Sequence, residues 1–192
     1  MAFSHQWRYA ATVSSAGKRL MKVGAALLML LAAAPAAAEL RSGTASGFES
    51  VHVAIVAAPP VEVFAALVEP ARWWNKDHTY SGDSANLRLE LRSGGCFCET
   101  VPVDGSIIEH GRVVYVRPGQ ALRLSAALGP LQAEGVAGAL SWTLKPVASG
   151  TEVTQSYVVG GFVRGGLGQV APAVDRVMGA QIEGLTALFA AR

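Results

Sequence analysis

Charged and aromatic residues are scarce in this chain of 192 residues, and only two cysteines occur. Charged side chains make up 16% of the sequence and aromatic side chains 7%, whereas hydrophobic residues make up 51%. A chain this apolar is not typical of a disordered protein, and one this poor in charge is not typical of a coiled coil. The length suffices for one domain with its own core and is short for two.

The sequence also lacks the short motifs of several large enzyme classes. No G-x-S-x-G, H-E-x-x-H or P-loop motif occurs, and no G-x-G-x-x-G follows a predicted strand. Each of these motifs sets catalytic or cofactor-binding groups at a fixed spacing. Their absence argues against the common hydrolase, zinc-peptidase and nucleotide-binding classes, and we expect no cofactor.

Acidic residues are missing from residues 1–38, which hold four of the 16 basic residues. The remainder of the chain therefore has 12 basic and 14 acidic side chains. The slightly basic net charge of the whole chain thus belongs to its N-terminal segment. Because the rest is slightly acidic, we expect no nucleic-acid partner.

A basic residue, an apolar run and an alanine run follow one another near the N-terminus. Lys22 precedes the apolar residues 23–31, and alanines lead up to Ala38. This order is typical of a secretory signal peptide, so we expect residues 1–38 to be removed by cleavage after Ala38. The apolar run is short for a membrane span. We therefore expect no stable span after cleavage and a periplasmic or secreted protein.

The predicted elements define one domain over residues 50–192, preceded by a flexible lead-in at 39–49. Period-two alternation separated by short turns predicts seven strands, at 50–56, 87–91, 96–101, 107–116, 121–127, 136–145 and 152–159. Proline positions and helical periodicity predict helices at 61–68, at 71–75 and from Pro172 to the C-terminus. Turns this short join antiparallel strands. The expected fold class is α+β, with two short helices after the first strand and a curved antiparallel sheet wrapped around a long C-terminal helix.

Five short motifs occur in an order that resembles one superfamily. They are Ala58-Pro59-Pro60-x-x-Val63-Phe64-x-Ala66-Leu67, Pro70-x-x-Trp73-Trp74, Gly94-Gly95-x-Phe97, Gly111-x-Val113 and Gly150-Thr151-x-Val153. Over about residues 48–192 the chain thereby resembles the START-like or SRPBCC superfamily, which includes polyketide cyclases and relatives of the heat-shock ATPase activator. The resemblance implies a helix-grip fold, a seven-stranded sheet around an apolar cavity, and a hydrophobic ligand such as a lipid or polyketide. The cytosolic partner of the heat-shock activators does not suit a chain with an export signal.

Cys96 and Cys98 lie two residues apart in a predicted strand, so their side chains share one face. Three interpretations stay open: two buried thiols, a disulfide, or a soft metal site completed by His110 or His78. Their Cα atoms would be roughly 6.5–7 Å apart in a regular strand, which is wide for a disulfide. Distortion at Gly94-Gly95 would help such a bridge to form, and an oxidising compartment favours it.

A carboxylate and an imidazole are also predicted to meet. If Asp104-Gly105 forms a two-residue turn, Glu99 lies opposite His110, and both point away from the two thiols. Inside a cavity this pair could act as general acid and base, with Tyr80 or Tyr157 as hydrogen-bond donor. On the surface it would be a cross-strand charge pair.

The favoured function is an exported protein that binds an apolar small molecule. The residues expected near the ligand are Trp74, Cys96, Cys98, His110, Tyr157 and Phe162. The glycine-rich segment 160–168 is expected to act either as a mobile gate or as a simple flexible connection. Two alternatives remain: a cyclase- or dehydratase-type enzyme that uses Glu99 and His110, and a non-catalytic protein-interaction or stress-response module.

Overall fold

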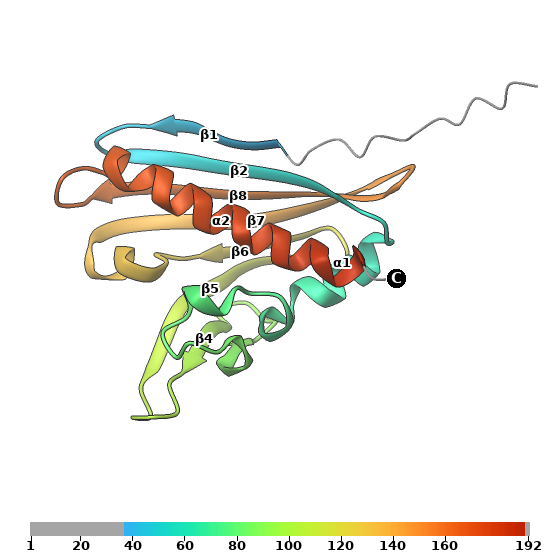
Figure 1. The fold of residues 1–192 in the computed structure, drawn as a ribbon, viewed down its shortest axis with the longest axis horizontal. Helices are drawn as coiled ribbons and strands as arrows, with labels where there is room; N and C mark the ends of the chain where they lie inside the picture. The colour runs from blue at the N-terminus through green and yellow to red at the C-terminus, as the bar shows by residue number, and fades with distance from the viewer. Residues whose placement is uncertain (1–36, 191–192) are drawn as a thin grey trace, which may run out of the picture. The chain divides into compact units, whose positions relative to one another are not determined.

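An eight-stranded antiparallel sheet and one long helix make up most of the described part of the chain (Figure 1). The structure, a computed structural model, describes residues 37–190. The strands are β1 Ala37–Gly43, β2 Gly47–Val56, β3 Leu87–Leu89, β4 Cys96–Thr100, β5 Ile107–Arg117, β6 Ala121–Ser125, β7 Gly135–Val147 and β8 Gly150–Phe162. Their order in the sheet is β1-β2-β8-β7-β6-β5-β4-β3. The two α-helices are α1 Pro60–Leu67 and α2 Leu167–Ala190.

Strand β1 occupies part of the segment that the sequence predicted to be a flexible lead-in. It pairs with β2 in antiparallel register, with Ala37 opposite Val53. The prediction of a flexible lead-in is therefore wrong for residues 39–43. Nothing in the sequence indicated this strand, because an edge strand can pair through its backbone groups alone and these residues do not alternate between apolar and polar. Most of the expected signal peptide, residues 1–36, lies outside the described residues.

Strand β2 turns polar side chains toward helix α2. Ser50 and His52 are buried, and both reach the carboxylate of Asp175 on α2: the serine hydroxyl donates to Oδ1 at 2.6 Å, and Nε2 of His52 lies 3.1 Å from the same oxygen. The alternation of these residues with Val51 and Val53 correctly predicts a strand. Their polar side chains can face the helix because the Asp175 carboxylate provides them with a hydrogen-bond partner. The Ser50 hydroxyl oxygen also lies 3.2 Å from Nε2 of His52, so the three side chains form one hydrogen-bonded cluster between β2 and α2.

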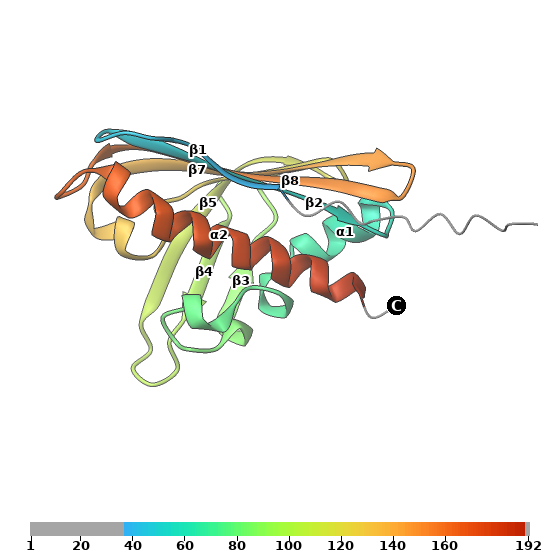
Figure 2. The same cartoon turned by 45° about the horizontal axis from the view of Figure 1, so that its top comes forward.

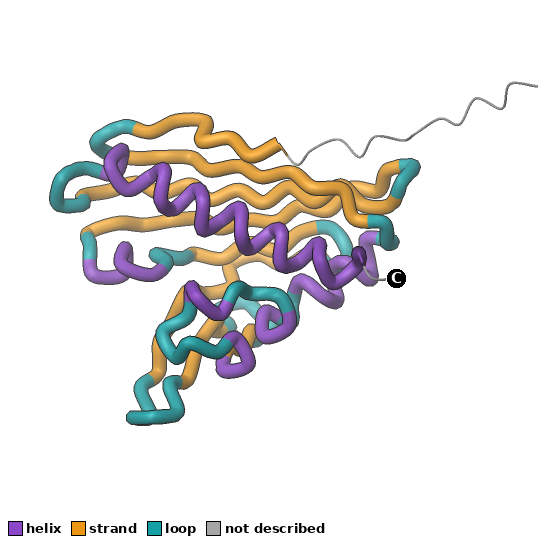
Figure 3. Tube along the Cα trace, viewed as in Figure 1, coloured by secondary structure: helices purple, strands orange, loops and turns teal. Residues whose placement is uncertain are grey.

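Short helical turns occupy the chain between α1 and β3 (Figure 3). The first, η1, spans Pro70–Arg72, and it replaces the second short helix expected at 71–75. The turns η2 and η3 span Lys76–His78 and Ser84–Asn86. Two buried tryptophans after η1 anchor this region in the core: the Trp73 ring packs edge-on against Trp142, and the Trp74 ring against Phe97.

Helix α2 begins five residues before the predicted start and contains Pro172. The buried side chain of Leu167 and the hydrogen bond from its N–H to the Ala45 carbonyl hold the start of the helix beside the β1–β2 turn. The glycine-rich segment is correspondingly shorter, because 160–162 belong to β8 and only 163–166 connect the two elements. A gate over the full segment 160–168 is therefore not what the structure contains.

The helix lies along one side of the sheet, against β1, β2 and β8, while β4 and β5 run in a different direction and curve the sheet (Figure 2). This arrangement confirms the α+β class and the helix-grip fold. It has one strand more than the superfamily resemblance implies, because β1 extends the edge. Within residues 37–190, no helix combines the length and the hydropathy needed to cross a membrane.

Candidate functional site

A cavity of about 620 Å³ opens between α2, the η2 turn and the 3-10 segment η4, Gly129–Ala133. This volume is in the range of small-molecule sites. Most of the wall is apolar, with Trp74, Leu128, Pro130, Leu131, Val170, Ala173, Val174, Val177 and Met178. The apolar stripe that periodicity predicted on the helix is therefore divided: Ile182 and Leu185 enter the core, while Val174 and Val177 face the cavity.

Glu99 on β4 is fully buried beside this cavity, and its carboxylate is held by three donors. The backbone N–H groups of Tyr80 and Ser81 donate to its two oxygens, and Nε2 of His110 lies 2.9 Å from Oε2. Glu99 thus ties the loop after η2 to the sheet. The loop positions the carboxylate, and the carboxylate in turn positions the imidazole.

His110 reaches Glu99 from a β-bulge in β5. Cys98 pairs with Glu109 and Phe97 with Gly111, so His110 is the extra residue between them. At Gly111 an added side chain would crowd Ala126, the residue after β6, which explains why glycine follows the histidine. The β4–β5 loop is longer than the two-residue turn expected, and Glu99 pairs with Ile108. This shift of two residues keeps Glu99 and His110 on the same face, so the expected pair still forms.

The electrostatics of the pair favour an ionised carboxylate beside a neutral imidazole. Burial alone would raise the pKa of Glu99, but the hydrogen bonds from Ser81, Tyr80 and His110 outweigh it and hold that pKa below its ordinary value. Burial lowers the pKa of His110, and the neighbouring carboxylate opposes this only in part. The ring is further fixed by Phe97, whose centroid lies 5.1 Å away.

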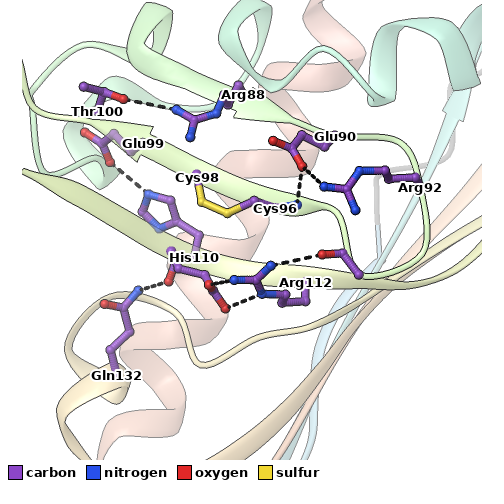
Figure 4. Close-up of a disulfide and its surroundings, with 12 residues drawn as sticks. Arg88, Glu90, Arg92, Cys96, Cys98, Glu99, Thr100, His110, Arg112 and Gln132 are labelled. Carbon is purple, nitrogen blue, oxygen red and sulfur yellow. Dashed lines mark hydrogen bonds and ion pairs between the residues drawn. A yellow bond between two sulfur atoms is a disulfide. The ribbon is translucent and has the colours of Figure 1, made fainter.

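Cys96 and Cys98 are joined by a disulfide on β4, with their Cα atoms 5.4 Å apart (Figure 4). The strand is contracted relative to the spacing of a regular strand, next to the bulge that carries His110. Strand alternation puts the bridge on the face opposite to Phe97 and Glu99. Neither cysteine lines the cavity, which corrects their assignment to it.

The metal hypothesis is not supported by this placement. Both sulfur atoms are engaged in the disulfide, and His110 points to the other side of β4 with its Nε2 on Glu99. His78 lines the cavity from the η2 turn. Among the side chains of the described residues, no three His, Cys, Asp or Glu residues gather as a set of metal ligands.

The remaining predicted lining residues divide between the cavity and its surroundings. Trp74 lies in the wall, and its indole N–H donates to the His78 carbonyl at 3.3 Å. Phe162 is 71% exposed at the end of β8, away from the lining, because strand alternation puts it on the same outward face as the exposed Val158. Tyr157 is buried behind the wall rather than in it.

Tyr157 supports the η4 wall through two backbone contacts. Its hydroxyl donates to the Ala126 carbonyl at 3.1 Å and accepts from the Leu128 N–H at 3.0 Å. Sequence reasoning missed this role because a tyrosine in an apolar strand carries no signal about which distant backbone groups it will meet.

We expect Tyr157→Phe to lower the free energy of unfolding by about 1–3 kcal/mol, because two backbone groups lose their partner. Burial raises the pKa of Tyr157 to about 12, above the 10 of an exposed tyrosine. The folded state therefore keeps the phenol neutral, and this contribution is present below pH 10 and lost as the pH rises to 12. Denaturant unfolding at pH 7 and pH 11 should show the gap between wild type and variant narrowing. The exposed Tyr115→Phe should show no such change; a gap independent of pH would contradict the argument.

Solved structures of low sequence identity share this fold. An uncharacterised protein from Rhizobium leguminosarum superposes with a TM-score of 0.56 at 17% identity, over 82% of this chain and 99% of that one. A protein from Rhodobacter sphaeroides gives 0.51 at 21%, over 81% and 99%. The di-domain ARO/CYC StfQ from the steffimycin biosynthetic pathway gives 0.53 at 17%, over 76% of this chain and 51% of that one. No protein-family model and no curated protein matches the sequence. At these identities the likeness establishes the helix-grip fold alone.

Proposed function

We propose that this protein binds an apolar small molecule in the cavity beside α2. The observation that carries the proposal is the wall itself: one side of a helix leaves Val174 and Val177 facing open volume instead of the sheet. Apolar surface facing a cavity of about 620 Å³ gains free energy when a ligand displaces its water. The third alternative, a protein-interaction module with a filled core, is disfavoured by this volume.

The binding proposal is tested by filling the cavity. Val177→Trp places a large ring in the lining, whereas Arg176→Trp places the same ring on the exposed side of the same helix. With N-phenyl-1-naphthylamine as a fluorescent apolar probe, we expect Val177→Trp to weaken binding at least about tenfold and Arg176→Trp to leave it unchanged. Circular dichroism of both variants controls for folding. Equal binding by the two variants, or no binding by wild type, would refute the proposal.

A cyclase- or dehydratase-type activity is the second candidate, and one observation favours it. His110 lines the cavity, and its ring is oriented by an ionised, buried carboxylate. A histidine held in this way can accept a proton from a bound substrate. The ARO/CYC protein StfQ shares this fold, which makes polyketide-like compounds the first substrates to assay for turnover.

We also propose membership of the START-like superfamily and export from the cell. The superfamily assignment is supported by the helix-grip fold together with the five motifs. The export proposal is supported by the order of residues around Lys22 and Ala38. Intact mass of the protein isolated from its own host tests it, because cleavage would leave a chain that begins at Glu39. A mass that includes residues 1–38 would contradict it.

A further inference from the structure

The cavity carries one buried polar side chain in its wall. Among the lining residues, all of which belong to the described part of the chain, His110 is 4% exposed. The other polar side chains stand at the open rim or are already paired. Asp77, His78, Tyr80 and Gln169 are exposed, and the Thr79 hydroxyl donates to the Lys76 carbonyl.

The contacts of His110 determine which ring nitrogen carries the proton. The Glu99 carboxylate accepts two backbone N–H groups and is ionised, so it can only accept at its remaining position. Nε2 of His110 must therefore carry the hydrogen of the 2.9 Å contact with Oε2 (Figure 4). In the neutral ring, Nδ1 then carries the lone pair.

Nδ1 of His110 is available to a ligand. The contact with Glu99 is the one hydrogen bond that the structure gives this ring among the described residues. No buried side-chain nitrogen or oxygen of these residues is left without a partner. Nδ1, which has none, is therefore reachable from the cavity rather than sealed in the core. The Tyr80 ring, with its centroid 6.0 Å from that of His110, flanks this approach.

We infer that the ligand is an apolar molecule bearing a hydroxyl, in the manner of a phenol or an enol, and that this hydroxyl donates to Nδ1 of His110. The inference rests on the proposed binding function and names the chemical class of its ligand. A single acceptor in an apolar wall favours a ligand with a hydrogen-bond donor. A ligand without a donor displaces water from Nδ1 and leaves that nitrogen without a hydrogen-bond partner, which weakens binding. Glu99 is a positioning residue, which fixes the tautomer that makes Nδ1 an acceptor.

The test compares three probes of nearly equal size: 2-naphthol, 2-methylnaphthalene and 2-methoxynaphthalene. The first donates a hydrogen bond, the second offers no polar group, and the third offers only an acceptor. We expect wild type to bind 2-naphthol at least about tenfold more tightly than the other two, measured by calorimetry or fluorescence. His110→Phe should bring 2-naphthol to the level of 2-methylnaphthalene. Arg176→Phe, which places the same ring on the exposed side of α2 outside the cavity, should keep the preference.

A measurement on the unmodified protein keeps the inference falsifiable if His110→Phe does not fold. Nitrogen-15 NMR of the histidine rings should show a protonated Nε2 and an unprotonated Nδ1 for His110. Addition of 2-naphthol should shift the Nδ1 resonance, and 2-methylnaphthalene should not. Equal affinities for these two probes, or a protonated Nδ1, would overturn the inference while leaving apolar binding intact. Binding of none of the three probes would instead refute the proposed function, and the inference with it.

Discussion

Glu99→Ala is expected to lower the free energy of unfolding by about 3–5 kcal/mol, because three hydrogen-bond donors lose a fully buried acceptor and each unsatisfied donor costs about 1–3 kcal/mol. The Glu99 carboxylate is fully buried, and it accepts from the backbone of Tyr80 and Ser81 and from His110. Without this carboxylate, two backbone N–H groups and the imidazole N–H have no acceptor, and each unsatisfied donor lowers the stability of the folded state. Denaturant unfolding at neutral pH measures the loss.

Glu109→Ala is the matched control for this prediction. Glu109 lies on the neighbouring strand and pairs with Arg112, but both side chains of that pair are about half exposed. Exposed pairs contribute about 0–1 kcal/mol, so this variant should unfold close to wild type. Hydrogen exchange adds a local readout: in Glu99→Ala the amides of Tyr80 and Ser81 should exchange much faster. If the two alanine variants are equally stable, the buried carboxylate does not hold the loop as described.

Gly184→Ala is expected to destabilise the fold by about 2–3 kcal/mol. A methyl group at this position of α2 would overlap the carbonyl oxygen of Trp73, which belongs to the backbone after η1. That oxygen cannot move alone, because the Trp73 ring is buried against Trp142 and its N–H donates to the Leu67 carbonyl. The helix would have to shift away from the loop that forms one side of the cavity.

The sign of this effect opposes the usual gain in helix propensity, since alanine is favoured over glycine in a helix interior by about 1 kcal/mol. Gly179→Ala on the same helix is the control. A methyl group there would lie 3.1 Å from an atom of the His52 ring, a tight contact but a milder one than the overlap with backbone at Gly184. Thermal unfolding should place Gly179→Ala within about 1 kcal/mol of wild type. A stabilised Gly184→Ala would show that the helix and the loop are not in close contact.

Most strands and helices were predicted to within a few residues, because alternation, helical periodicity and turn residues reflect local preferences that the fold also obeys. The strand over 50–56 and the helix over 61–68 appear almost as expected. The errors occur where long-range pairing decides the structure. Strand β1 forms because β2 offers it a partner, and α2 starts early because Ala45 accepts its first N–H.

The site was only partly predictable for the same reason. Glu99 and His110 could be placed on one face of the sheet although the predicted register was wrong. The actual register differs from the predicted one by two residues, and a shift by an even number leaves each side chain on the same face. Tyr157 was misplaced because apolar character does not reveal which side of a wall a residue occupies. Phe162 was misplaced because β8 runs further than predicted, so that its odd spacing from Tyr157 puts it on the opposite face. Asp175 was missed as the partner of Ser50 and His52, although an acid in an apolar helical repeat is a usable signal.

The pairing of β2 with β8 has a consequence for the time course of folding. The two strands pair from Gly47 opposite Gly160 to Val56 opposite Thr151, so each contact joins residues about a hundred positions apart. Neither β2 nor α2 can find its place until the C-terminal strand exists, whereas the β3–β7 meander needs only near neighbours. High contact order slows folding. Until β8 has been synthesised, β2 therefore has no partner on that side, and the N-terminal edge of the sheet is the last part to close.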